Sequence, residues 1–169
     1  VEIIEKISND CKIKPENLTF ILTPTTSISG NLQVISRILE VAIHKAHELN
    51  FPLENIIDGM GTTPIPPIGK NFIEGMGRTN DSIIYGGTVI LICKGSDEEL
   101  KNLSKNLTSK TSKDYGKPFK DIFEAYNRDF YKIDGSLFSP AKVIINSNES
   151  GKTFISGGIN YKLLKKSFF

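Results

Sequence analysis

The amino-acid sequence predicts an α/β fold in which a mixed sheet is layered with helices. Segments with the composition of strands alternate with segments whose apolar residues recur at helical spacing, an order typical of α/β domains. The 169 residues, 38% hydrophobic and 24% charged, are enough for one domain with a real core. We therefore interpret residues 1–169 as one compact α/β unit.

The first elements are a predicted helix, a strand and a second helix. The apolar residues of the first helix share one face, and they are Ile3, Ile4, Ile7 and Cys11. Pro15 ends this helix, and "LTFILT", Leu18 to Thr23, is expected as a buried strand. A turn rich in serine and threonine then precedes a long helix over about Asn31 to Leu49. These elements form the strand, turn and helix with which an α/β layout begins.

The segment from Asp58 to Gly87 holds seven glycines and three prolines in thirty residues. Prolines stiffen the backbone while glycines permit close approach, so we interpret the part before residue 82 as a shaped loop around a ligand rather than a linker. Ser82 to Lys94 follows as strands joined or bent at Gly86 and Gly87.

The C-terminal part of the chain predicts helices and a hairpin. Ser96 and the acidic residues after it mark a helix start, and the polar segment Lys105 to Lys117 is expected as a mobile surface connection. "FKDIFEAYN" predicts a short helix and "NYKLLKKSFF" a terminal one. Between them, "SPAKVIINS" and "KTFISGG" predict two strands joined by a turn of Asn, Glu, Ser and Gly.

Charge and composition exclude several classes of protein. The 21 basic and 19 acidic residues leave a net charge of +2, too small to indicate a nucleic-acid or membrane surface. Two isolated cysteines and two histidines, Cys11, Cys93, His44 and His47, form no recognisable metal ligand set or disulfide framework. No apolar stretch has the length of a membrane helix and no signal peptide is recognised, so we expect a cytoplasmic protein.

The long predicted helix carries a polar stripe along one side. The stripe consists of Arg37, Glu40, His44 and Glu48. One interpretation is an exposed, ion-paired face, which is common and contributes little to stability. The other is that the stripe lines a pocket, where a guanidinium keeps a carboxylate ionised and the carboxylate orients water beside a cationic substrate.

The glycine-rich segment has no nucleotide-binding motif. "GMG" occurs twice, but neither copy has the strand, GxGxxG and helix context of a dinucleotide fold. "RTND", Arg78 to Asp81, places four polar residues just before a predicted strand, where their side chains can point into a cleft. The alternative is turn chemistry, in which Asn80 and Asp81 cap their own backbone.

Four segments together resemble a known family. "TPTTSISGNLQVISRILEVAIHK", "GTTPIPPI", "MGRTNDSIIYGG" and "DFYKIDGSLFSPAKVIINSNESGKTF" resemble, in order and spacing, the methenyltetrahydromethanopterin cyclohydrolase family of methanogenic and related archaea. The resemblance runs from Val1 to Phe169 and covers the C-terminal half of a family chain, whose two α/β domains enclose a pocket. It implies that the N-terminal half is absent from this chain.

The resemblance implies reversible hydrolysis of the methenyl bridge of 5,10-methenyltetrahydromethanopterin to the N5-formyl derivative, in archaeal C1 metabolism and methanogenesis. The implied catalytic residues are Arg37 and Glu40: Glu40 positions and deprotonates the attacking water, and Arg37 holds Glu40. Implied substrate contacts are Ser27, Gly30, Thr62, Pro64, Arg78, Thr79, Asn80 and Asp81. His44 and Lys45 are expected to hold these residues in place without contacting the substrate themselves.

The resemblance also implies which partners the protein has. The expected ligand is a tetrahydromethanopterin C1 derivative, with no metal and no redox cofactor, no nucleic acid and no membrane. A homotrimer is expected, and three alternatives are open for the N-terminal half: it lies on a separate chain, it was cleaved away, or it was never made. An alternative is a non-catalytic pterin-binding or assembly subunit that needs that separate half.

Overall fold

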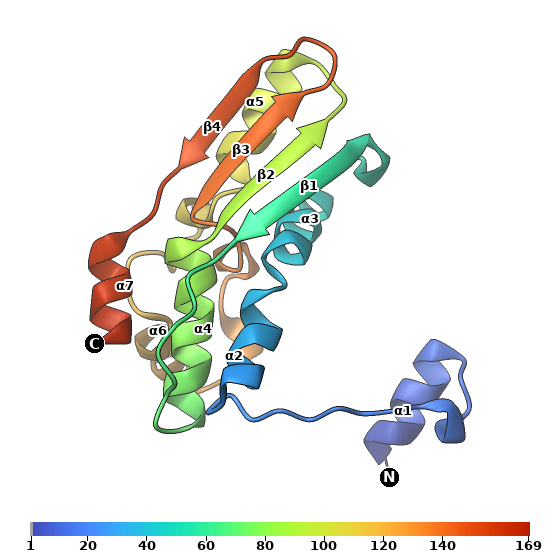
Figure 1. Ribbon diagram of the computed structural model, residues 1–169, viewed down its shortest axis with the longest axis vertical. Coiled ribbons are helices and arrows are strands. Elements are labelled where there is room, and N and C mark those ends of the chain that lie inside the picture. The colour runs from blue at the N-terminus through green and yellow to red at the C-terminus, as the bar shows by residue number, and fades with distance from the viewer. Residues whose placement is uncertain (1) are drawn as a thin grey trace.

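The computed structural model describes residues 2–169 and consists of one mixed sheet, seven α-helices and short 3₁₀ turns between them (Figure 1). The helices are α1 (Glu2–Cys11), α2 (Ile28–Ile35), α3 (Ile38–Glu48), α4 (Phe72–Gly86), α5 (Asp97–Asn106), α6 (Phe119–Ala125) and α7 (Tyr161–Phe168). The strands are β1 (Ile56–Thr62), β2 (Thr88–Cys93), β3 (Lys142–Ser147) and β4 (Thr153–Gly157). The predicted α/β class is confirmed.

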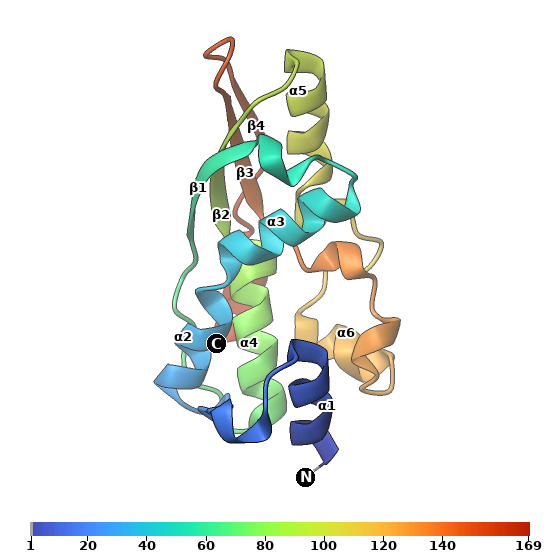
Figure 2. The same cartoon turned by 90° about the vertical axis from the view of Figure 1, so that its right-hand side faces the viewer.

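The sheet has the order β1-β2-β3-β4, with β2 and β3 parallel and both outer pairs antiparallel. Alternate residues of the two central strands face α3 and α5, which cover one side of the sheet (Figure 2). Val89, Leu91, Val143 and Ile145 are fully buried on that side and form the main core with both helices. Removing this apolar area from water is the chief stabilising contribution of the sheet.

No helix among residues 2–169 covers the opposite side of the sheet (Figure 1). The strand register places four apolar residues in one row across it, Met60, Ile90, Ile144 and Ile155. The two outer members of this row, Met60 and Ile155, are more than half exposed.

A second core lies beyond the end of the sheet, where α4, α6 and α7 meet. It is largely aromatic, and Phe119 is fully buried with its ring stacked on Phe123 at 6.2 Å between centroids. Tyr85 of α4 is also fully buried, and its hydroxyl donates to the Lys117 carbonyl oxygen at 2.5 Å. This core fixes α4 against the C-terminal helix.

Several predicted elements are confirmed. The first helix, the helix capped by Ser96, the short helix α6, the β3–β4 hairpin and the terminal helix all form where the sequence predicts them. Ser96 accepts a hydrogen bond from the Glu99 amide at 3.3 Å, as an N-cap residue should. None of the helices within residues 2–169 has the length and apolar character needed to cross a bilayer.

The long helix predicted over residues 31–49 is wrong, because the chain turns at Ser36 and Arg37 into two helices. The turn lets the helices bury different surfaces, since α2 packs against α4 whereas α3 packs against β1 and β2. Ile35 and Ile38, on either side of the turn, are both buried.

The long loop predicted before residue 82 is also wrong, because residues 56–62 form β1 and residues 72–86 form α4. The glycines of β1 serve close packing: a Cβ on Gly61 would lie 2.6 Å from Cγ2 of Ile38, and one on Gly59 would lie 2.9 Å from Cδ1 of Leu39. They bring α3 close to the sheet. Only residues 63–71 remain as a loop, and the strand expected from Ser82 begins at Thr88.

The segment Lys105 to Lys117, expected as a surface connection, is exposed in only part of its length. Leu107 and Ser109 are fully buried, and the Ser109 hydroxyl donates to the Ile84 carbonyl oxygen at 2.6 Å. The polar side chains that indicated a surface loop instead form hydrogen bonds with buried backbone groups.

The strand predicted for Leu18 to Thr23 is wrong as well. These residues are extended but pair with no strand, and Ile21 and Leu22 are 87% and 89% exposed. Together with α1 they form an arm, residues 2–23, that extends away from the body, residues 24–169 (Figure 1). A buried strand needs a neighbouring strand, and no part of the described body provides one.

Candidate functional site

Arg37 and Glu40 lie at the start of α3, where the chain turns out of α2. Arg37 occupies the N-cap position and Glu40 the first turn of the helix. Arg37 Nε lies 3.7 Å from Glu40 Oε2, and the two side chains are 53% and 64% exposed. Three-residue spacing on a helix brings such a pair together, and solvent keeps its contribution to stability small. The pair is therefore accessible to a ligand from outside.

The same exposed side of α3 carries His44. Its Nδ1 lies 3.7 Å from Glu48 Oε1, one turn further along the helix. The stripe is thus a polar face open to solvent that includes the ion pair of Arg37 and Glu40, which matches the first interpretation of its spacing. Within this chain it is not enclosed, so a pocket around it requires another surface.

Lys45 points to the opposite side of α3 and is buried. Its Nζ donates to the Ser136 carbonyl oxygen at 3.2 Å. Burial lowers the pKa of Lys45, while the carboxylates of Glu48 and Asp134 act in the opposite direction. Lys45 therefore joins α3 to the turn before β3 and does not lie beside Glu40 on the exposed face.

The loop after β1 runs alongside α2 and is held by polar contacts. The Thr63 hydroxyl donates to the Ile35 carbonyl oxygen at 3.0 Å, and Asn31 Nδ2 donates to the Pro66 carbonyl oxygen at 3.3 Å. The first bond places the segment containing Thr62 and Pro64 next to the turn that carries Arg37. The structure therefore brings these two regions of the predicted site together.

Thr62 and Pro64 also line a groove of about 330 Å³. The groove lies where the ends of β1 and α4 and the start of β2 meet α7, and Thr88, Ile159 and Tyr161 contribute to it. The loop that we expected to be a preformed wall thus borders this groove, and its role as a wall for a ligand stays a prediction. Two other hollows have volumes of about 530 Å³ along α5 and about 240 Å³ between α4, α6 and α7, and neither Arg37 nor Glu40 lines any of the three.

Ser27 and Gly30 build the N-terminus of α2. The Ser27 hydroxyl oxygen accepts from the Gly30 amide at 3.0 Å and donates to the Pro24 carbonyl oxygen at 2.7 Å. A Cβ on Gly30 would lie 2.0 Å from that carbonyl oxygen, so only glycine fits there. In this structure both residues serve local geometry.

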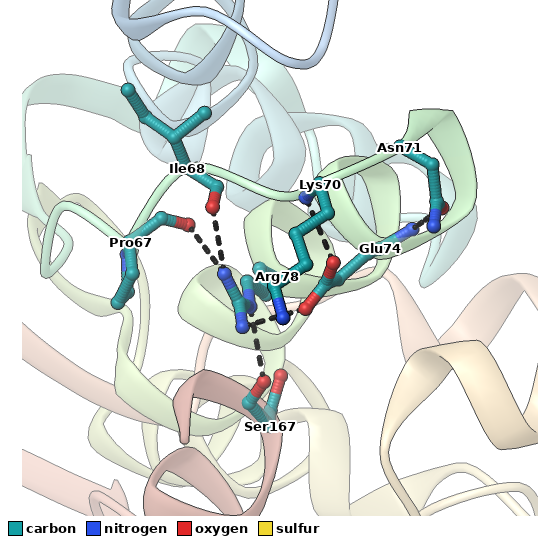
Figure 3. A network of polar contacts seen from close by, with 7 residues as sticks. All are labelled: Pro67, Ile68, Lys70, Asn71, Glu74, Arg78 and Ser167. Atoms are coloured by element: carbon teal, nitrogen blue, oxygen red, sulfur yellow. Dashed lines mark hydrogen bonds and ion pairs between the residues drawn. The ribbon is translucent and has the colours of Figure 1, made fainter.

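Arg78 is largely buried and connects three segments (Figure 3). Its guanidinium forms an ion pair with Glu74 at 2.7 Å and donates to the carbonyl oxygens of Ile68 at 2.8 Å, Pro67 at 3.3 Å and Ser167 at 3.3 Å. Five N–H donors in a planar fork allow one arginine to satisfy all of these acceptors. Arg78 thus ties the loop 63–71 and the end of α7 to α4.

Thr79, Asn80 and Asp81 lie within α4, so the expectation that they precede a strand and point into a cleft is wrong. The Thr79 hydroxyl and Asn80 Nδ2 both donate to the Met76 carbonyl oxygen, at 3.0 Å and 2.9 Å. Asp81 Oδ1 accepts from the Phe119 amide at 2.8 Å. The alternative of turn chemistry is also wrong, because these side chains bond to helical backbone or across to α6.

Asp81 is a fully buried carboxyl group. Burial raises its pKa to about 7, although the Ser167 hydroxyl and the Phe119 amide favour the ionised form. Oδ2 has no hydrogen-bond partner of good geometry among residues 2–169. The group is placed to hold a proton near neutral pH inside the fold.

Sequence reasoning missed Glu74 and Ser167, which complete the Arg78 network. Glu74 also accepts from the Lys70 amide at 2.8 Å, which lowers its pKa together with the nearby Arg78 charge. The four-residue spacing of Glu74 and Arg78 and the Asn71 cap three residues before Glu74 were available signals of a helix. Ser167, 89 residues from Arg78, had no local signal.

No cluster of three or more metal-ligating side chains occurs in the part of the chain that the structure describes. Of the predicted site residues, Arg37 and Glu40 together combine a carboxylate, a cation and access from solvent. The arrangement can orient water and accept a proton from it.

Comparison with known proteins shows which family this chain is similar to. A family described as cyclohydrolase (MCH) matches residues 1–168. Proteins called methenyltetrahydromethanopterin cyclohydrolase are 53% identical in Methylobacillus flagellatus and 51% identical in Methylosinus trichosporium, over 99% and 98% of this chain. One from Rhodopirellula baltica is 40% identical over 99% of this chain. The matches cover 51%, 64% and 51% of the relatives, so the chain spans about half the length of two of them.

Proposed function

This chain belongs to the cyclohydrolase (MCH) family, and on that premise we propose that it hydrolyses the methenyl bridge of 5,10-methenyltetrahydromethanopterin. The product is the N5-formyl derivative, and the reaction is reversible. The observation that carries the proposal is the exposed pair of Arg37 and Glu40, 3.7 Å apart on a helix within the matched region.

Glu40 is the proposed base. The methenyl carbon lies between two nitrogens and shares their positive charge, so it accepts an electron pair from water without prior activation. As the C–O bond forms, one proton of the water passes to the Glu40 carboxylate. Arg37 holds that carboxylate and stabilises its negative charge before the proton arrives.

The adduct then opens. The bond from carbon to the second nitrogen breaks, that nitrogen takes the hydroxyl proton, and the carbon remains on N5 as a formyl group. One water is consumed and one proton is released overall. Because the substrate supplies the electrophile, positioning of water and carboxylate is the main task of the protein, and we propose that no metal or redox cofactor is required.

Thr62 and Pro64 are the proposed substrate contacts best supported by the structure, because they line a groove and adjoin the turn that carries Arg37. Ser27, Gly30 and the four residues from Arg78 to Asp81 use their polar atoms or close packing within the fold. A contact of these residues with substrate therefore rests on the family resemblance alone. His44 stays a proposed supporting residue on the exposed face, and Lys45 supports α3 from its buried side.

The relatives come from a different biological setting than the one that the resemblance implies. The Methylobacillus and Methylosinus relatives are bacterial rather than archaeal, so an archaeal methanogenic setting is not carried forward. The relatives are also full-length chains rather than split ones. A homotrimer and a separate chain for the N-terminal half of the family remain proposals without support from these comparisons.

The test follows loss of the methenyl absorbance of the substrate. The chain is assayed alone and after co-expression with the part of the Methylobacillus flagellatus relative that it does not match. Glu40→Gln keeps the size of the side chain but removes the base, and we expect turnover to fall by about 10²–10⁴-fold. Glu98→Gln, the same change at an exposed position on α5, is the matched control and should retain activity.

Unchanged turnover in Glu40→Gln would overturn the role of this residue. Binding of substrate without turnover, in both preparations, would favour the alternative of a non-catalytic pterin-binding or assembly subunit. A specific observation favours that alternative, since the chain spans only 51% of its Methylobacillus flagellatus relative.

A further inference from the structure

The break between α2 and α3 sets the direction of the helix that carries Glu40. Ser36 and Arg37 form this break, and α3 starts afresh after them. In an unbroken helix the Ile35 carbonyl oxygen would accept from the Leu39 amide, four residues further along. Among residues 2–169 no backbone amide bonds to this carbonyl oxygen, although Ile35 is buried. A buried carbonyl group without a partner is costly, so the break needs a donor from elsewhere in the chain.

The hydroxyl of Thr63 supplies this donor. Its Oγ1 donates to the Ile35 carbonyl oxygen at 3.0 Å. Thr63 follows directly on β1, and β1 ends beside the junction of α2 and α3 (Figures 1 and 2). The bond joins residues 28 positions apart, so it is a tertiary contact rather than a local cap. It takes the place of the helical hydrogen bond that the break removes.

The end of β1 also packs against the start of α3. A Cβ on Gly61 would lie 2.6 Å from Cγ2 of Ile38 and 3.5 Å from the Leu39 nitrogen, so the strand backbone lies directly on the first turn of α3. Gly61 and Thr63 therefore contact the two sides of the break, one through close packing and the other through a hydrogen bond. This short segment holds the end of α2 and the start of α3 together.

Arg37 and Glu40 do little to fix their own positions. Arg37 occupies the N-cap position of α3, but its side chain forms no capping hydrogen bond. Its Nε lies 3.7 Å from Glu40 Oε2, and both side chains are more than half exposed. An exposed ion pair of this kind contributes little to stability. The positions of the two groups therefore depend on the backbone of the break.

We propose that Thr63 is a positioning residue for the proposed hydrolysis, because its hydroxyl fixes the break between α2 and α3. The break in turn sets where Arg37 and Glu40 stand relative to the substrate. This inference rests on the proposed function of that pair. Thr63 also lines the groove after β1, but its hydroxyl proton is already donated to Ile35. The two roles differ in their kinetics, since loss of a substrate contact raises KM whereas a shift of Glu40 lowers kcat.

Two variants of Thr63 test this role. Thr63→Val keeps the shape of the side chain and removes the hydroxyl, whereas Thr63→Ser keeps the hydroxyl. Turnover is followed by loss of the methenyl absorbance. We expect kcat to fall by about 10–100-fold in Thr63→Val while KM changes by less than about threefold. Thr63→Ser should retain kcat within about threefold because its hydroxyl can still reach the carbonyl oxygen. Thr153→Val, the same change at an exposed position on β4, is the matched control and should alter neither constant.

A second measurement does not depend on turnover. Amide hydrogen exchange in residues 36–41 reports on the break itself, and circular dichroism shows that each variant is folded. We expect exchange there to be at least about tenfold faster in Thr63→Val than in Thr63→Ser or the unaltered chain, because the hydroxyl no longer holds the break.

The outcomes separate this inference from the proposed function. Equal exchange in the two Thr63 variants and the unaltered chain would overturn the role of Thr63, and so would an equal loss of kcat in both variants. A rise in KM at unchanged kcat in Thr63→Val would identify a substrate contact instead. No turnover by the unaltered protein would overturn the proposed function, and the exchange result alone would then decide whether Thr63 holds the break.

Discussion

Asp81 lies near the middle of α4, and its carboxyl group faces the N-terminus of α6 and the end of α7. The Phe119 amide donates to Oδ1, and the nearby Asp121 carboxylate adds to the effect of burial in raising the pKa of Asp81 to about 7. The ordinary value is 3.8, so the folded protein binds this proton more tightly than the unfolded chain does. Stability should therefore fall as pH rises from about 4 to about 7, and change little above that from this group.

The Asp81→Asn variant tests this linkage. Asparagine keeps an oxygen for the Phe119 amide but does not ionise, so the variant should lack this fall in stability. We expect it to exceed the unaltered protein by about 1–3 kcal/mol in free energy of unfolding at pH 8, with a smaller difference near pH 5. Urea unfolding at both pH values measures this. Asp10→Asn, exposed on the arm, is the control, and parallel pH profiles for Asp81→Asn and the unaltered protein would contradict the assignment.

At the scale of elements, α4 organises the region around the candidate site. Asn71 caps it by accepting from the Glu74 amide at 3.0 Å, and Arg78 extends from its middle to the loop 63–71 and to α7. The loop in turn bonds to α2 through Asn31 and Thr63. The segment that contains Thr62 and Pro64 is therefore held in place by α4. None of these hydrogen bonds joins α4 to Arg37 or Glu40.

The Arg78→Lys variant isolates this connection. Lysine keeps the charge, but a single ammonium cannot replace a planar fork that reaches Glu74 and three carbonyl oxygens. We expect a loss of about 1–3 kcal/mol in free energy of unfolding and faster amide hydrogen exchange in residues 65–71. Arg128→Lys, the same change at an exposed position, should alter stability by less than about 0.5 kcal/mol. Equal effects of the two variants would show that the Arg78 contacts do not hold the loop.

At the scale of the whole molecule, the body and the arm differ in what stabilises them. The body has two cores, one between the sheet and its covering helices and one among α4, α6 and α7. The arm has no core of its own among its described residues, and α1 has only ten residues, a length at which an isolated helix is marginal in water. The body is therefore stabilised by its own two cores, whereas the described part of the arm has none.

Shortening the chain to begin at Pro24 should leave the body intact. We expect its free energy of unfolding to change by no more than about 0.5 kcal/mol, because no described hydrogen bond or ion pair crosses the junction. Leu91→Ala in the main core should instead cost about 2–5 kcal/mol. Urea unfolding followed by circular dichroism distinguishes these outcomes, and a large loss on truncation would show that the arm supports the body.

By itself the sequence determined the features that depend on near neighbours. The cap at Ser96, the β3–β4 hairpin, the terminal helix and the three-residue spacing of Arg37 and Glu40 were all predictable, because each arises within one short, continuous stretch of chain. The family was also recognisable from the order of its segments.

Only the tertiary structure decided the features that depend on distant partners. Gly59 and Gly61 indicated a loop, yet they lie in strand β1. Glycine is needed there because a Cβ would collide with the side chains of α3, which packs against the strand. Arg78 was predicted to contact a ligand, yet its acceptors lie in a loop and in the last helix. Residues 18–23 have the composition of a buried strand, but burial and pairing require another surface, and the described body does not supply it. Local sequence sets what a segment can form, and contacts between remote segments determine whether it does.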